Sequence, residues 1–249
     1  MKAENILKQL SQEQKMQYKG GIYYLTQIDL AYNSNRIEGS QLSKEHTRSL
    51  FETQTLTAAK DELIRADDVI EARNHFRAFD YILLNTMQEL SEKFIKEIHK
   101  ILKQGTSDAD LSWFRTGEYK ALENIVGGHA TTPPGQVANQ IQALLAAYNA
   151  PGTRTLAEII DFHVSFEQIH PFQDGNGRVG RLLMFKECLK NNIVPFIIDN
   201  LHKNYYYRGL DQYAKEKGYL IDTCLSAQDK YAALCMKFVP GFMDEDNTL

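Results

Sequence analysis

The feature that most constrains this chain is a twelve-residue stretch from His170 to Arg181, which reads HPFQDGNGRVGR. It combines one imidazole, one carboxylate, three glycines and two arginines. Glycines let backbone N–H groups turn toward an anion, because no Cβ stands in the way. A helix that begins at about Gly177 would direct its positive end toward the same anion. The stretch therefore predicts a phosphate-binding loop that opens a helix.

The charged side chains of this stretch suit the chemistry of polyphosphates. Arg178 and Arg181 are three residues apart, so both can face a polyphosphate from the first helical turn. Asp174 is a candidate ligand for the divalent cation that nucleoside triphosphates carry, although capping the next helix is a common role for Asp. His170 can accept a proton near neutral pH. Together these groups predict phosphoryl or nucleotidyl transfer.

Most of the remaining sequence has the apolar spacing of helices. One helix is expected from residue 22 to about 37, ended by Gly39, and a longer helical pattern covers 67–90. A capping box at Thr155 opens the helix that leads to His170. Between residues 113 and 134, glycines and prolines bracket the segments 118–120 and 124–126, which predicts a hairpin of two short strands. We therefore expect one all-α domain with a small β-hairpin.

Composition excludes several classes of protein. The net charge of −4 argues against a nucleic-acid partner, because nucleic-acid domains usually carry a basic face. The three cysteines have no CxxC spacing, which indicates reduced thiols instead of disulfides or a zinc site. No apolar run approaches the roughly 20 residues of a membrane span, and the N-terminus has no signal-peptide pattern. A cytoplasmic protein that does not bind membranes is expected.

A dinucleotide-binding oxidoreductase is the rival hypothesis from another class of enzyme. Gly175, Gly177 and Gly180 match the GxGxxG pattern, and Asp199 follows at about the expected distance of ~20 residues. However, His170-Pro171 stands where the first strand should run into the loop, and no alternation of strands and helices surrounds it. GxGxxG alone is weak support, so this hypothesis is disfavoured.

The stretch from His170 to Arg181 resembles, without departure, the signature of the Fic family, HPFx(D/E)GNGRxxR. The resemblance extends more loosely from about residue 34 to 214, through the following positions: Glu71 with Asn74-His75, Gly117-Glu118-Tyr119, and Tyr205-Tyr206. It implies an all-α, Fic-type helical domain with a β-hairpin flap, and this domain spans residues 1–249. Within it we expect N-terminal helices with an inhibitory helix at about 22–38, a core at about 65–217 and C-terminal helices at 218–249.

The resemblance also implies an activity, the transfer of AMP from Mg²⁺-bound ATP to a Ser, Thr or Tyr hydroxyl of a protein target or of the chain itself. His170 would be the general base and Asp174 the magnesium ligand. The expected nucleotide-binding residues are Gly175, Asn176 and Gly177 in an anion hole, and Arg178 and Arg181 on the phosphates. The flap at about 117–132 would dock the target as an added strand. Lys120 stands where the family often has Arg.

The segment from Ser34 to Gly39 resembles the inhibitory motif of the family, (S/T)xxxE(G/N). It implies that Glu38 pairs with Arg181 and so occupies the arginine that the γ-phosphate needs. In some relatives the same glutamate supports removal of AMP, so de-AMPylation stays open, as does another nucleotide donor. An ATP-sensing regulatory module without turnover is the alternative from a different class. The sequence does not identify the target, and a homo-oligomer stays open.

His163 and the pair Tyr205 and Tyr206 can be explained by a structural role as well as by a functional one. His163 lies one heptad before His170 and is expected to be packed or hydrogen-bonded. Tyr205 and Tyr206 are candidates for contact with adenine, but a core or surface helix explains them equally well.

Overall fold

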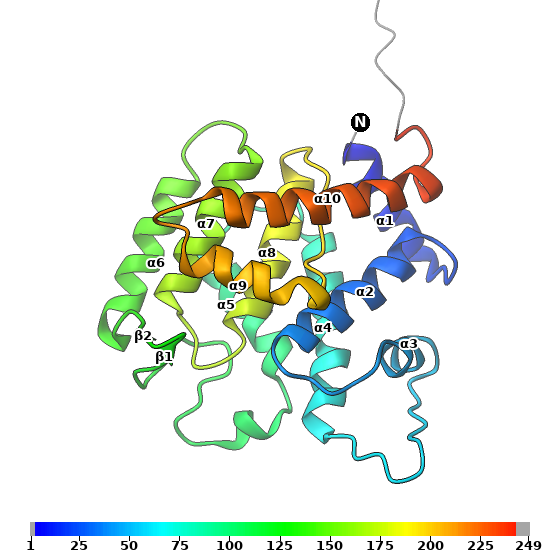
Figure 1. Cartoon of the computed structure of the whole chain (residues 1–249), viewed down its shortest axis with the longest axis horizontal. Coiled ribbons are helices and arrows are strands. Elements are labelled where there is room, and N and C mark those ends of the chain that lie inside the picture. Colours follow the sequence, from blue (N-terminus) through cyan, green and yellow to red (C-terminus); the bar gives the residue numbers. More distant parts are fainter. Residues whose placement is uncertain (1–2, 243–249) are drawn as a thin grey trace, which may run out of the picture.

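The computed structural model describes residues 3–242, which form ten α-helices, two 3₁₀ turns and one small sheet (Figure 1). The elements are α1 (Ala3–Met16), α2 (Ile22–Ile37), α3 (Lys44–Thr53), α4 (Ala66–Leu84), α5 (Glu92–Lys103), η1 (Ser107–Asp110), β1 (Ile125–Val126), β2 (His129–Ala130), α6 (Pro134–Tyr148), α7 (Leu156–Ile169), α8 (Asn176–Lys190), η2 (Asn200–His202), α9 (Lys203–Asp211) and α10 (Gly218–Phe238). The all-α fold with a hairpin is therefore confirmed. No helix within residues 3–242 is long and apolar enough to cross a membrane.

Helix α8 lies at the centre of the molecule, with α7, α4 and α5 packed around it (Figure 1). Every residue from Asn176 to Leu189 is buried. A helix that is covered on all sides forms the middle of a core. Because the first two turns of α8 carry Arg178 and Arg181, this burial also places two guanidinium groups inside the protein.

Helix α7 begins with the predicted capping box. The Thr155 side chain accepts a hydrogen bond from the Glu158 backbone, and the Glu158 side chain accepts one from the Thr155 backbone. The helix ends at Ile169, and the backbone of its C-cap residue, His170, is left-handed with φ of 51°. The turn from α7 into α8 follows directly, so His170 is fixed at the junction of these two helices.

Helix α2 ends at Ile37, as expected, and packs against α4 and α8. The predicted pattern over 67–90 was too long, because α4 ends at Leu84. A turn follows, and α5 begins at Glu92 after its cap, Ser91. Leu90 is buried in the core although it is not helical, which is why its apolar character extended the pattern.

The hairpin lies later in the sequence than predicted. Ile125–Val126 pairs antiparallel with His129–Ala130, and Gly127 and Gly128 supply the positive φ angles of the turn. Residues 118–120 form no strand. The backbone N–H of Lys120 donates instead to the carbonyl of Pro171, in the loop after His170.

The dinucleotide-binding hypothesis is wrong. The glycine-rich loop follows a helix, α7, where that fold requires a strand. The strand-like residues 193–198 have no partner strand in the described chain. The cysteines agree with the sequence-based expectation, since Cys188, Cys224 and Cys235 are all free and buried.

Helices α9 and α10 pack closely at Gly209, and this contact gives a test of the fold. A Cβ at Gly209 would meet the backbone of Leu220 at 2.8 Å, and backbone cannot move aside easily. We expect Gly209→Ala to be destabilised, because overpacking of about 1–3 kcal/mol exceeds the gain in helix propensity of about 1 kcal/mol. The matched control is Gly135→Ala in α6, where a Cβ would meet nothing and the propensity gain should remain. Urea unfolding of both variants measures the contrast, and equal stabilities would contradict the packing.

Candidate active site

The loop between α7 and α8 is held by its own side chains. Asn176 accepts a hydrogen bond from the Phe172 N–H at 2.8 Å and donates one to the Phe172 carbonyl at 2.9 Å. Gly175 precedes α8 with φ of 82°, in the left-handed region that glycine adopts without strain. The Asn176 side chain therefore shapes the loop, and only its backbone N–H remains to face an anion at the start of α8.

His99 supports the same loop from α5, a role that no sequence motif indicates. Its ring stacks on Phe172 with centroids 3.9 Å apart. Nδ1 accepts a hydrogen bond from the Gly117 N–H at 2.9 Å, which leaves the Nε2–H to donate to the Asp174 carbonyl at 3.1 Å. Burial lowers the pKa of His99 to about 3, so the ring is neutral. His99 thus joins the loop to the segment that leads into the hairpin.

Arg181 connects the site to α2. Its Nε donates to Ser34 Oγ at 3.1 Å, and Nη2 donates to the Ser34 carbonyl at 2.9 Å and to Glu38 Oε1 at 2.7 Å. Only 4% of the Arg181 side chain is exposed. Against the effect of burial, Glu38 raises the pKa of Arg181, so the guanidinium is charged. The structure therefore brings together Ser34, Glu38 and Arg181, as the sequence motif implies.

The carboxylate of Glu38 also lies against the first turn of α8. A Cβ at Gly177 would collide with Glu38 Oε1 and approach Arg181 Nη1 to 2.8 Å. The carboxylate accordingly sits where the positive end of the helix dipole attracts an anion. Its oxygens stand in the position that the sequence assigned to phosphate.

Asp174 and Arg178 belong to a second ionic network. Arg178 contacts Glu71 at 2.6 Å and Asp174 at 2.7 Å, and its side chain is 3% exposed. Lys103, from α5, contacts Glu71, Asp108 and Asp174 within 2.9 Å and is 1% exposed. Although burial opposes it, Arg178 and Lys103 hold the pKa of Asp174 well below its usual range. Asp174 is therefore an ionised carboxylate, and it does not cap α8, which has no side-chain cap.

His170 is placed to act as a neutral base. Its Nδ1 is buried and has no hydrogen-bond partner among residues 3–242. Burial lowers the pKa of the imidazole, and the charge of Lys120 lowers it further. An uncharged imidazole can accept a proton at neutral pH.

The tyrosines of α9 lie behind the ion pair. Tyr206 is buried and hydrogen-bonded to His163 Nε2 at 2.8 Å, and its ring centroid lies 5.8 Å from Arg181 Cζ. His163 is therefore hydrogen-bonded, as expected. Tyr207 donates to the Ile37 carbonyl at 3.1 Å, next to Glu38. Tyr205 is 53% exposed and lines a surface cavity together with residues of α10, such as Tyr219.

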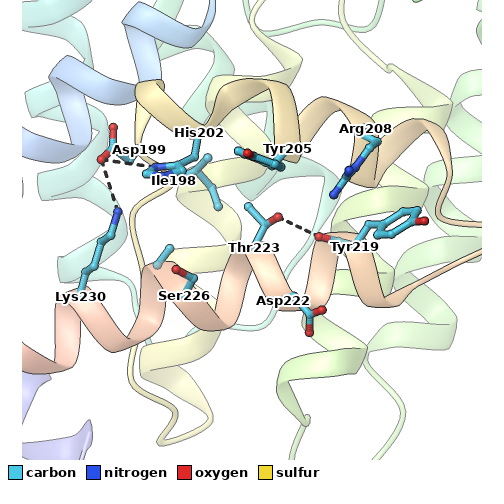
Figure 2. Close-up of a pocket in the computed structure, with 11 residues that line it drawn as sticks. Ile198, Asp199, His202, Tyr205, Arg208, Tyr219, Asp222, Thr223, Ser226 and Lys230 are labelled. Carbon is cyan, nitrogen blue, oxygen red and sulfur yellow. Dashed lines mark hydrogen bonds and ion pairs between the residues drawn. The ribbon is translucent and has the colours of Figure 1, made fainter.

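A surface cavity of about 240 Å³ lies between α9 and α10 (Figure 2). Tyr205, Arg208 and Tyr219 line one end, and Asp199 contacts His202 and Lys230 at the other. No residue of the loop from His170 to Arg181 lines this cavity. The site built around His170 is therefore separate from it.

The structure is an all-α fold with a small hairpin, and His170 lies in the turn that leads into α8. Residues 89–188 match the model of the Fic/DOC family. Over this segment the chain is similar to that family.

Similar proteins include enzymes and solved structures. The protein adenylyltransferases Fic of Aedes aegypti and Drosophila yakuba are 28% and 30% identical to this chain over 72% of its length. The matched regions are 36% and 35% of those proteins, so the chain spans about a third of their length. A Fic domain-containing signalling protein from Bacteroides thetaiotaomicron superposes with a TM-score of 0.73 at 20% identity, covering 96% of this chain and 99% of that one. Fic-1 of C. elegans also gives a TM-score of 0.73, at 19% identity, covering 85% of this chain and 63% of that one.

The raised pKa of Glu167 predicts that the stability of the protein depends on pH. Burial raises the pKa of its carboxyl from 4.5 to about 8; the charge of Arg181 opposes this rise and that of Glu38 adds to it. A raised pKa in the folded state favours folding below about pH 4.5, and this contribution is lost as pH rises toward 8. We expect Glu167→Gln to lessen the fall in unfolding free energy between pH 5 and 8, as measured by urea titration. An unchanged slope would show that Glu167 ionises normally.

Proposed function

We propose that this domain transfers AMP from Mg²⁺-bound ATP to a hydroxyl of a protein, and that Glu38 holds it in an inhibited state. The observation that carries this proposal is the carboxylate of Glu38 on Arg181 and Gly177. It marks an anion site at the start of α8, in the loop that begins with His170. The similarity to adenylyltransferases supports AMP as the group transferred.

In this proposal His170 accepts the proton of the target hydroxyl. The hydroxyl oxygen then forms a bond to the α-phosphorus, and the bond from that phosphorus to the pyrophosphate oxygen breaks. General base catalysis by a positioned imidazole typically contributes about 10²–10⁴-fold. The neutral state of His170 supports this role, because a protonated imidazole has no lone pair to offer.

The two arginines have different parts in the proposal. Arg178 is held by Glu71 and Asp174, so its main role is to orient Asp174. Arg181 is held mainly by Glu38 and Ser34, which belong to another element, and becomes available to phosphate when α2 moves. Bidentate contact between guanidinium and phosphate makes Arg181 suited to the γ-phosphate. Gly175, Asn176 and Gly177 would contribute backbone N–H groups to the same anion.

Asp174 fits a magnesium ion that arrives with the nucleotide. Mg²⁺ is commonly held by one or two carboxylates together with substrate phosphates and water. Asp174 is ionised and 43% exposed, and both cations that touch it contact the same oxygen, Oδ2. The ion would neutralise charge on the phosphates. Among residues 3–242 no group of three acidic, His or Cys side chains could hold a metal ion by itself.

The hairpin is the proposed docking site for the protein target. Ile125 is 73% exposed and Val126 is 46% exposed, in a sheet of only two strands. Such an edge can accept an extended segment as an added strand, which recognises backbone more than side chains.

Release of Glu38 tests the activity. We expect Glu38→Gly to acquire at least about tenfold more AMP than the wild type, equivalent to ~1.4 kcal/mol of inhibition removed. Intact-mass analysis after incubation with Mg²⁺ and ATP would detect the added AMP on the chain, and α-labelled ATP would detect it on targets in an extract. Glu38→Gly/His170→Ala is the matched control and should bind ATP without transfer.

Other outcomes would point to other functions. A Glu38→Gly variant that binds ATP but transfers no AMP would favour a nucleotide-sensing module. Transfer from UTP or another nucleotide in place of ATP would reassign the donor. Loss of AMP from a labelled target with the wild type, but not with Glu38→Gly, would favour AMP removal.

A further inference from the structure

We propose that Lys120 is a positioning residue that fixes the hairpin to the loop of His170, so that the docked target and the base keep one relative position. The proposal rests on the proposed function for its consequence in catalysis. Its structural part can be tested without turnover.

Lys120 contacts the chain on both sides of His170. Its backbone N–H donates to the Pro171 carbonyl at 2.9 Å, and its Nζ lies 3.5 Å from the Ile169 carbonyl. The residue is only 4% exposed. Movement of Lys120 would therefore displace the backbone that carries the imidazole.

The same ammonium group ties together the two sides of the hairpin. Nζ donates to Asn124 Oδ1 at 2.8 Å and to Thr131 Oγ1 at 2.5 Å. Asn124 and Thr131 also pair through their backbones, just outside the β1–β2 ladder. In addition, Asn124 Nδ2 donates to the Phe172 carbonyl at 3.4 Å. The base of the hairpin and the loop after His170 thus share one hydrogen-bonded cluster.

The chemistry of lysine matches this cluster. An ammonium group has three donors, and Asn124, Thr131 and Ile169 supply three acceptors. No carboxylate within residues 3–242 forms an ion pair with Lys120, so neutral oxygens accept its hydrogen bonds, while the charge of Glu123 favours its protonated form without contact. Burial lowers the pKa of Lys120 to about 8. An unpaired buried ammonium costs stability, which a methionine side chain would avoid.

The charge of Lys120 also acts on His170. It opposes formation of the imidazolium, whereas Glu38 and Asp174 favour it. Lys120 therefore helps to keep the base neutral in the presence of two carboxylates. Docking and proton acceptance depend on distances that a displacement of about 1 Å is enough to disturb.

Three substitutions separate geometry from charge. Lys120→Met removes both the hydrogen bonds and the charge, Lys120→Gln keeps hydrogen bonds without charge, and Lys120→Arg keeps the charge. The matched control is Lys8→Met, at an exposed position on α1, far from the hairpin (Figure 1). Thermal unfolding identifies any variant that fails to fold, in which case the remaining two still decide the question.

The first readouts need no turnover. In an NMR titration we expect the pKa of His170 to rise in Lys120→Met and Lys120→Gln and to stay near the wild-type value in Lys120→Arg and Lys8→Met. Amide hydrogen exchange of residues 124–131 should become at least about tenfold faster in Lys120→Met, which corresponds to ~1.4 kcal/mol of lost protection. An unchanged pKa and unchanged exchange in Lys120→Met would overturn the proposal, even if its melting temperature fell.

Kinetics in the Glu38→Gly background add the catalytic consequence. Lys120→Met should lower kcat/KM for the protein target by about tenfold or more while the KM for ATP stays within about twofold. The acid limb of its pH–rate profile should move to higher pH, because the base is protonated more readily. An equal loss with both substrates and an unmoved acid limb would contradict the positioning role. If Glu38→Gly transfers no AMP at all, the proposed function fails, while the NMR and exchange results still judge Lys120.

Discussion

The ion pair between Arg181 and Glu38 is the interaction on which the arrangement of this site depends. A guanidinium group inside a core is costly unless charges and hydrogen bonds compensate it. Here α2 supplies both, through Glu38 and Ser34. Helix α2 therefore packs on α4 and α8 through its apolar residues and also through its C-terminal end, where Ser34 and Glu38 compensate the buried charge of Arg181. The start of α8 and the segment that covers it are consequently parts of one packing arrangement.

The two arginines of the loop show how spacing alone leaves roles undetermined. Arg178 and Arg181 are on the same face of α8, yet their partners come from different parts of the chain. Arg178 is paired within the loop and with Glu71 on α4, whereas Arg181 is paired with the end of α2. A residue whose partners lie on its own rigid core stays in place, while one held by a separate segment can exchange partners. In the proposed function, this difference makes Arg181 the point at which Glu38 exerts control.

The sequence predicted those features that depend on local chemistry. The capping box at Thr155, the helix end at Ile37 and the hairpin follow from residues a few positions apart. The contact of Glu38 with Arg181 was implied only by resemblance to a family. His99 and Lys103 were missed, because the partners that place them in the site, Glu71 and Asp174, lie more than 30 residues away in the sequence. The prediction of a strand at 118–120 was wrong for the same reason, a partner distant in the sequence. The backbone N–H of Lys120 donates to the Pro171 carbonyl and not to a neighbouring strand.

The charges around Arg181 also limit what can replace Glu38. If α2 withdraws, the guanidinium stays buried among Tyr206, Glu167 and the start of α8. Glu167 is protonated near neutral pH, because burial raises its pKa to about 8, and it cannot neutralise the arginine without first losing that proton. A phosphate group brings its own negative charge and acceptors for the free helix N–H groups. In the proposed function, a polyanion would therefore favour opening of the site more than a neutral ligand would, and nucleotide binding would be coupled to release of Glu38.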